Sequence, residues 1–213
     1  MPRKKLKRFA ELATFPNVFY DPFAMKGRWR ELFFQNDHAL TLELACGKGD
    51  YTLALARKFP EKNFIGVDAK GARLWTGAKT ALLENLPNAA FLKGQIEQIA
   101  LFFAEQEVQE IWITFPEPYP ENAKAKKRLT APRFLNEYRR ILPPGGMIHL
   151  KTDDLDLFKF SLKAVQAEGG VIHEALPDLY QVPDGGESTA IQTTYERRYL
   201  TAGRTIKYLR FSL

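Results

Sequence analysis

Five short apolar segments alternate with helical segments over residues 39–168, and this alternation limits the folds open to the chain more than any other feature. The apolar segments predict buried strands at 40–45, 63–68, 89–93, 110–115 and 146–151. The stretches between and after them predict helices at 51–59, 71–86, 96–105, 131–141 and 154–168. Strands that alternate with helices form a parallel sheet with helices on both faces and right-handed crossovers. We therefore expect a doubly wound α/β sheet.

The C-terminal part predicts two further strands, at 170–175 and 204–212, which bring the expected sheet to seven strands. A loop is predicted between them at 177–192, where prolines and glycines gather (Pro177, Pro183, Gly185, Gly186).

The N-terminal part lacks the strand-helix alternation. Residues 1–23 are basic, then aromatic and broken by Pro16 and Pro22, so we expect a mobile tail followed by an arm packed by its aromatic side chains. Residues 24–35 predict a short helix. The expected organisation is an extension over 1–23 and a single domain over 24–213.

Composition excludes several classes of protein. Apolar residues make up 45% and charged residues 26% of the 213 residues, which is ordinary for a globular domain and unlike a disordered or collagen-like chain. Cys46 is the only cysteine, as is typical of a reducing compartment. No apolar run approaches the roughly 18 residues of a membrane helix. No signal peptide follows the basic N-terminus, so we expect a cytoplasmic protein without membrane contact.

The glycine-rich turn LELACGKGD at 42–50 joins the first predicted strand to a helix. Gly47 and Gly49 allow the backbone to approach a ligand there. Glu43 lies within an otherwise apolar strand, where an unpaired carboxylate is costly. Asp68 ends the next strand, where a carboxylate accepts hydrogen bonds from ribose hydroxyls. The alternative for Glu43 is a structural residue bonded to loop backbone.

Two coenzymes fit such a turn. A dinucleotide places its pyrophosphate at the helix start, but Asp50 stands there and repels phosphate. S-adenosylmethionine has no phosphate and carries positive charge, so the carboxylates favour it over NAD. Gln95, after the third strand, is a candidate for reading adenine; the alternative is a helix-capping residue.

The segment FPEPYP at 115–120 holds a carboxylate rigidly after the fourth strand. Pro116 and Pro118 flank Glu117 and restrict the backbone. Ligands bind at this edge of a doubly wound sheet, which makes Glu117 a candidate functional residue; a solvent-exposed turn is the alternative. The basic run that follows either is a solvated face or clamps the phosphates of a nucleic acid (Lys124, Lys126, Lys127, Arg128).

Taken together, these motifs resemble the bacterial tRNA (guanine-N7-)-methyltransferase family. The matching segments are LELACGKG, FPEPYP with KKRLT, KTDD at 151–154 and TTYERR at 193–198, in the family's order. The sequence departs from the family pattern at Ala45, Glu117, Tyr119 and Glu121, where the family has glycine, aspartate, tryptophan and lysine.

The resemblance implies a Rossmann-like class I methyltransferase fold, mostly parallel with an antiparallel last strand. It implies S-adenosylmethionine as the cofactor and N7 of the variable-loop guanine at tRNA position 46 as the target. Glu117 takes the catalytic place and also contacts the cofactor, beside Glu43, Gly47, Gly49, Asp68 and Gln95. Substrate contacts carry over to Lys124, Asp153, Thr193, Tyr195 and Glu196.

Other expectations concern partners and alternatives. The net charge of +6 is compatible with a tRNA partner. We expect no metal, because the three histidines are far apart in sequence, and a monomer or homodimer. Two other functions stay open, a methyltransferase for a small molecule and a non-catalytic tRNA-binding protein. An NAD-dependent enzyme is the most distant alternative.

Overall fold

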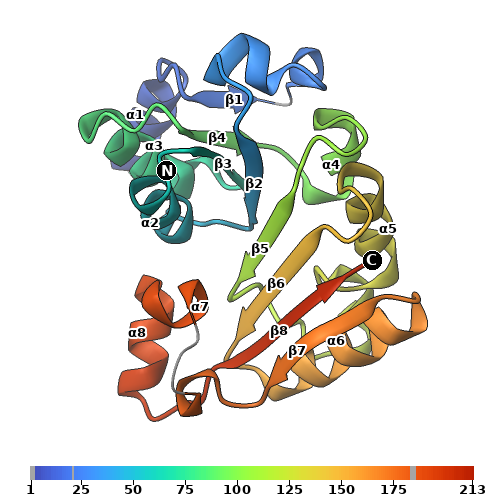
Figure 1. The fold of residues 1–213 in the computed structure, drawn as a ribbon. Coiled ribbons are helices and arrows are strands. Elements are labelled where there is room, and N and C mark those ends of the chain that lie inside the picture. The colour runs from blue at the N-terminus through green and yellow to red at the C-terminus, as the bar shows by residue number, and fades with distance from the viewer. Residues whose placement is uncertain (1–2, 21, 183–185) are drawn as a thin grey trace.

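The computed structural model describes residues 3–20, 22–182 and 186–213, and of residues 3–5 only the backbone. Within these residues eight strands form one sheet, in the order β1-β4-β3-β2-β5-β6-β8-β7 (Figure 1). The strands are β1 (Val18–Tyr20), β2 (Ala39–Leu44), β3 (Lys62–Asp68), β4 (Ala89–Lys93), β5 (Glu110–Thr114), β6 (Met147–Thr152), β7 (Val171–Leu176) and β8 (Lys207–Ser212).

The helices lie between the strands in the chain. The α-helices are α1 (Arg3–Leu12), α2 (Asp50–Lys58), α3 (Gly71–Leu83), α4 (Ile99–Phe102), α5 (Pro132–Ile141), α6 (Leu155–Ala167), α7 (Glu187–Ala190) and α8 (Thr194–Thr201). Shorter or irregular turns are η1 (Phe23–Met25), η2 (Arg30–Phe34), η3 (Ile96–Gln98), η4 (Asn122–Lys127) and η5 (Leu179–Gln181). Among the described residues, none of these helices has the length and apolar character to cross a membrane.

The topology confirms the predicted doubly wound sheet. Strands β1 to β6 pair in parallel, and β8 runs antiparallel to both β6 and β7. The chain moves from β2 outward to β3 and β4, then returns to place β5 and β6 on the other side of β2. Such a switch in strand order opens a crevice at the carboxyl ends of the central strands, here β2 and β5.

The sheet has eight strands and not the expected seven because part of the aromatic arm pairs with β4. In this pairing Val18 lies opposite Phe91, and the Phe91 amide donates to the Asn17 carbonyl at 2.8 Å. A three-residue strand between prolines carries no periodic signal, so only the partner strand reveals it.

The N-terminal tail is helical where we expected a mobile segment. Helix α1 packs on α3, with Leu12 fully buried. The Glu11 carboxylate accepts a hydrogen bond from the Trp75 indole at 3.0 Å and from the Lys79 ammonium at 2.9 Å. These tertiary contacts stabilise a helix whose basic sequence shows no strong signal by itself.

The expected loop at 177–192 also differs, because it contains η5 and α7. Pro183 and Gly185 lie outside the described residues. The expected strand at 204–212 begins only at Lys207, because Lys207 pairs with Thr152, the last residue of β6.

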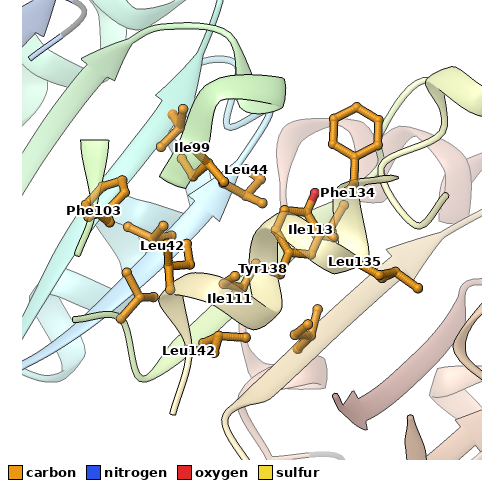
Figure 2. Packing of buried hydrophobic residues seen from close by; sticks show 14 of the residues in the cluster. Leu42, Leu44, Ile99, Phe103, Ile111, Ile113, Phe134, Leu135, Tyr138 and Leu142 are labelled. Atoms are coloured by element: carbon orange, nitrogen blue, oxygen red, sulfur yellow. The ribbon is translucent and has the colours of Figure 1, made fainter. Parts of the chain in front are cut away.

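Apolar side chains fill both faces of the sheet. On one face, Leu42, Leu44 and Ile111 pack beneath α4 and α5, as Figure 2 shows with Phe103 and Tyr138. On the other face a second cluster joins the sheet to α1, α2 and α3. Because both faces are covered, the carboxyl ends of the strands are where the fold leaves room for a ligand.

Candidate functional site

A cleft of about 800 Å³ opens at the carboxyl ends of β2, β3, β5 and β6. Its volume lies within the roughly 300–1,000 Å³ typical of small-molecule sites. The predicted site residues that line it are Glu43, Gly47, Asp68, Gln95, Glu117, Asp153, Thr193 and Tyr195. Gly49, Lys124 and Glu196 lie outside this lining.

The glycine-rich turn borders the cleft through Gly47 rather than Gly49. A Cβ added at Gly47 would meet no atom of the described chain within 4 Å, so this residue faces open space. The Gly47 amide donates to Asp68 Oδ2 at 3.0 Å. A Cβ at Gly49 would lie 2.5 Å from the Phe91 ring, so this glycine lets helix α2 pack on the sheet. Gly49 thus has a packing role, and its expected cofactor contact stays a prediction.

Glu43 joins elements together at the floor of the cleft. Its carboxylate accepts hydrogen bonds from the Thr52 amide at 2.8 Å, the Thr52 hydroxyl at 2.6 Å and the Thr114 hydroxyl at 2.9 Å. Burial raises the pKa of Glu43 to about 7, although these hydrogen bonds act to lower it. Glu43 therefore has a structural role, as the alternative reading of this residue expected, and it also borders the cleft.

Asp68 and Gln95, the two residues predicted to contact ribose and adenine, both border the cleft. The Asp68 carboxylate accepts from the Gly47 and Lys70 amides, the latter at 2.7 Å, which fixes its orientation. Each carboxylate oxygen has a second lone pair, so ribose hydroxyls can still donate to it. Gln95 is exposed and borders the cleft, and within the described chain its side chain makes no capping bond to η3.

The turn that carries Glu117 is held by a buried arginine. The Arg128 guanidinium donates to the Pro118 carbonyl at 2.9 Å and to the Tyr119 carbonyl at 3.0 Å. Phe115 and Tyr119 adopt positive φ angles of 50° and 44°, which this support helps to maintain. Glu117 itself is exposed and faces the cleft.

The basic run after this turn divides between two roles. Arg128 is buried, so it positions the turn and is not a phosphate ligand. Lys124 pairs with Glu121 at 2.8 Å and is not among the residues that line the cleft. Lys126 and Lys127 do line it, and the substrate contact expected of Lys124 stays a prediction.

Asp153 borders the cleft, and its neighbours Thr152 and Asp154 accept the hydrogen bonds from the local backbone amides. Asp154 caps α6, with its carboxylate accepting from the Leu157 amide at 2.6 Å. The Thr152 hydroxyl accepts from the Asp154 amide at 3.1 Å. The helix-capping alternative therefore applies to Asp154 and leaves the Asp153 side chain for the cleft.

In the segment TTYE at 193–196, too, some side chains cap a helix and others border the cleft. Thr193 caps α8 by accepting from the Glu196 amide at 3.0 Å, and it borders the cleft while buried. Tyr195, in the first turn of α8, is 44% exposed and faces the cleft.

Glu196 is fully buried and does not border the cleft, and its expected contact with substrate stays a prediction. Its carboxylate lies 2.6 Å from the Lys151 ammonium and accepts from the Tyr180 hydroxyl at 2.9 Å. Lys151 also donates to the carbonyls of Ser188 at 2.7 Å and Ile191 at 3.0 Å. This buried pair fastens the C-terminal segment to β6, and a carboxylate so satisfied has little left to offer a nucleobase.

Sequence reasoning missed several residues of the cleft because they lie outside the recognisable motifs: Arg73, Arg133 and Tyr199. Asp50 was noted only as an obstacle to phosphate. Its carboxylate accepts from the Thr194 amide at 2.7 Å, so it connects the glycine-rich turn to α8. Lone charged residues of this kind give no signal that distinguishes them from a solvated surface.

Comparison with known proteins identifies the family. Residues 37–209 match the profile of a family described as "Putative methyltransferase". A tRNA (guanine-N(7)-)-methyltransferase of Christiangramia forsetii is 48% identical, over 99% of this chain and 98% of the relative. A protein of the same name from Brevibacillus brevis is 34% identical over 92% of this chain and 91% of the relative. The chain belongs to the tRNA (guanine-N7-)-methyltransferase family.

Solved structures agree with this family's fold. The 16S rRNA methyltransferase KamB superposes with a TM-score of 0.67 at 15% identity, covering 88% of this chain and 93% of that chain. A 16S rRNA (adenine(1408)-N(1))-methyltransferase with cosubstrate SAM, from Catenulisporales acidiphilia, gives 0.62 at 18% identity, covering 87% and 90%. At these identities the likeness shows the fold alone. The predicted fold class, family, enzyme class and cofactor, S-adenosylmethionine, are thereby confirmed.

Proposed function

We propose that this chain transfers the methyl group of S-adenosylmethionine to N7 of the variable-loop guanine at position 46 of tRNA, in the cytoplasm. The observation that carries the proposal is the single cleft in which the glycine-rich turn, Glu117 and Tyr195 meet. The relatives' name specifies tRNA guanine N7, and the position within tRNA is our proposal.

The cofactor half of the cleft suits a cationic nucleoside. Asp68, held by the Gly47 and Lys70 amides, would accept from the ribose hydroxyls, and Gln95, which borders the cleft, would contact adenine. Gly47 faces open space into which a ligand fits. Asp50 supplies negative charge near the turn. S-adenosylmethionine, when bound, supplies a methyl group on a positively charged sulfur.

The other half of the cleft suits a nucleobase. Guanine N7 already carries an in-plane lone pair, so no residue has to remove a proton before methylation. The chain's task is positioning and exclusion of water. Glu117, on its rigid turn, faces the cleft, where a carboxylate stabilises the positive charge that the methylated ring acquires.

The decisive experiment is incubation with labelled S-adenosylmethionine and unmodified tRNA transcript, followed by nucleoside analysis. We expect 7-methylguanosine from this transcript and none from a matched transcript without the variable-loop guanine. Label at a different guanine would contradict position 46. Binding of both ligands without transfer would favour a non-catalytic tRNA-binding protein, for which the departures at Glu117, Tyr119 and Glu121 are the best support.

A further inference from the structure

Helix α8 begins against an acidic residue of a distant element. Asp50, in the first turn of α2, accepts a hydrogen bond from the Thr194 amide through Oδ2 at 2.7 Å. Thr194 is the first residue of α8, and Thr193 before it is the N-cap. The bond joins residues 144 positions apart in the chain, and it connects the glycine-rich turn directly to the start of α8.

The two sides of this bond border different halves of the cleft. Asp50 lines it beside the glycine-rich turn, where we place the cofactor. Tyr195, Arg198 and Tyr199 line it from α8, where we place the RNA. Carboxylate oxygens have about four lone pairs in total, so Asp50 can hold α8 and still accept from the ammonium group of the cofactor. One side chain therefore stands between the two ligands of the reaction.

The Asp50 bond orients α8 and is not what attaches it. The Lys151 ammonium lies 2.6 Å from the Glu196 carboxylate and donates to the Ile191 carbonyl at 3.0 Å. These buried contacts keep the C-terminal segment on β6 when the Asp50 bond is absent. Of these contacts, the bond from Thr194 to Asp50 is the one whose two residues both line the cleft.

We propose that the bond between Asp50 and Thr194 couples the two binding events, so that bound cofactor raises the affinity for tRNA. The coupling rests on the proposed function, because it needs RNA at α8. A cofactor that contacts Asp50 fixes this side chain and with it the start of α8, so the RNA then loses less entropy in ordering that helix. By linkage, bound tRNA raises the affinity for the cofactor by the same factor. Asp50 and Thr194 are thus positioning residues.

The test measures the dissociation constant of tRNA with and without saturating sinefungin, an unreactive and positively charged analogue of S-adenosylmethionine. The readout is the ratio of the two constants within each variant, because a general loss of RNA contacts changes both alike. For the wild type we expect a ratio of about five or more, as is typical of coupled sites. Formation of 7-methylguanosine from S-adenosylmethionine tests the proposed function separately.

Thr194→Pro removes the donor and leaves the acceptor in place. Proline has no N–H and is favoured at the first position of a helix. Thr193 has φ −71° and ψ 164°, the extended conformation that a residue before proline prefers. We expect the ratio to fall to near one in this variant. Sinefungin alone should bind as it does to the wild type, because the Asp50 carboxylate is unchanged.

Thr194→Ala is the matched control, because it shortens the same side chain and keeps the amide, and its ratio should equal that of the wild type. Asp50→Ala removes the acceptor and should also bring the ratio to near one, with weaker binding of sinefungin. Combining Asp50→Ala with Thr194→Pro should change the ratio no further, since both remove one bond. Urea unfolding confirms that each variant is folded.

Three results would overturn the inference even where 7-methylguanosine forms. A wild-type ratio near one would show that cofactor and tRNA bind independently. A ratio retained in Thr194→Pro would show that the coupling passes through other contacts. A ratio lost equally in Thr194→Ala would assign the effect to the threonine side chain and not to its amide.

Discussion

Three glutamates of this chain show how surroundings decide what one side chain does. Glu43 and Glu196 are both buried. Glu43 accepts a hydrogen bond from the Thr52 amide, and Glu196 forms an ion pair with Lys151. Glu117 is exposed on a turn held from behind by Arg128. Glu43 and Glu196 stabilise the walls of the cleft, whereas Glu117 presents an exposed carboxylate to it.

The raised pKa of Glu43 predicts a pH-dependent stability. The folded protein holds a proton near pH 7, whereas an unfolded glutamate releases it near pH 4.3. Stability from this group is therefore complete below about pH 4.3 and falls as pH rises through about 7. Between pH 5 and 8 the wild type should lose on the order of 3 kcal/mol more than Glu43→Gln in urea unfolding. Equal pH slopes in both proteins would contradict this assignment.

Glu117→Gln keeps the shape of the side chain and removes its charge. Because the carboxylate is proposed to stabilise a developing cation, we expect kcat to fall about a hundredfold at saturating cofactor and tRNA. Glu117→Asp, which restores the residue usual in the family, should retain activity. Single-turnover methyl transfer measures both, and a Gln variant as fast as the wild type would remove Glu117 from catalysis.

At the scale of elements, the C-terminal segment over residues 187–201 forms a wall of the cleft because α2 and β6 hold it. Asp50 at the start of α2 accepts from the Thr194 amide, and the Tyr51 hydroxyl donates to the Glu187 carbonyl at 3.0 Å. Lys151 from β6 reaches two carbonyls and Glu196. In Figure 1, α8 accordingly lies beside the ends of β5 and β6.

The buried Lys151–Glu196 pair makes a prediction about this segment. Burial lowers the pKa of Lys151, and Glu196 opposes that effect. Lys151→Met leaves a buried carboxylate unpaired and should cost about 3–5 kcal/mol. The double variant Lys151→Met with Glu196→Leu should recover much of this loss, because it removes both charges. Urea unfolding gives the energies, and hydrogen exchange should show faster exchange over residues 187–201 in the single variant.

That prediction also separates two roles for Glu196. If Glu196 contacted guanine directly, Glu196→Gln would weaken tRNA binding while leaving stability unchanged. We expect instead that Glu196→Gln lowers the free energy of unfolding and has a smaller effect on tRNA binding.

At the scale of the whole molecule, the positions of the basic side chains suit the binding of a polyanion. The net charge is only +6, but exposed basic side chains gather in the cleft lining (Lys48, Lys70, Arg73, Lys126, Lys127, Arg133, Arg198, Arg204). Carboxylates lie among them at the cofactor turn. A cationic cofactor and a polyanionic RNA can therefore be bound side by side.

Binding of tRNA should weaken steeply with salt, because each phosphate contact releases counterions. Replacing Lys126, Lys127 and Arg198 by alanine should reduce the slope of log Kd against log salt by about 2. The matched control removes three exposed cations outside the cleft lining, Arg139, Lys159 and Lys163. Filter binding at several salt concentrations measures both, and equal slopes in the two triple variants would contradict a phosphate role for the cleft cations.

The sequence by itself determined the doubly wound sheet, the family and the turns that carry Gly47, Asp68 and Glu117. Strand periodicity, glycine turns and proline turns are local, so they can be read along the chain. Their convergence at one edge follows because parallel strands place their carboxyl ends together.

Only the tertiary structure decided which polar residues face the cleft. Glu196 was predicted to contact substrate, but its carboxylate accepts a hydrogen bond from Lys151, 45 residues earlier in the chain. Lys124 was expected in the cleft, and the short turn η4 presents Lys126 and Lys127 instead. Strand β1 and helix α1 exist through contacts with β4 and α3. Burial and long-range pairing decide each of these, and neither is a property of the neighbouring residues in sequence.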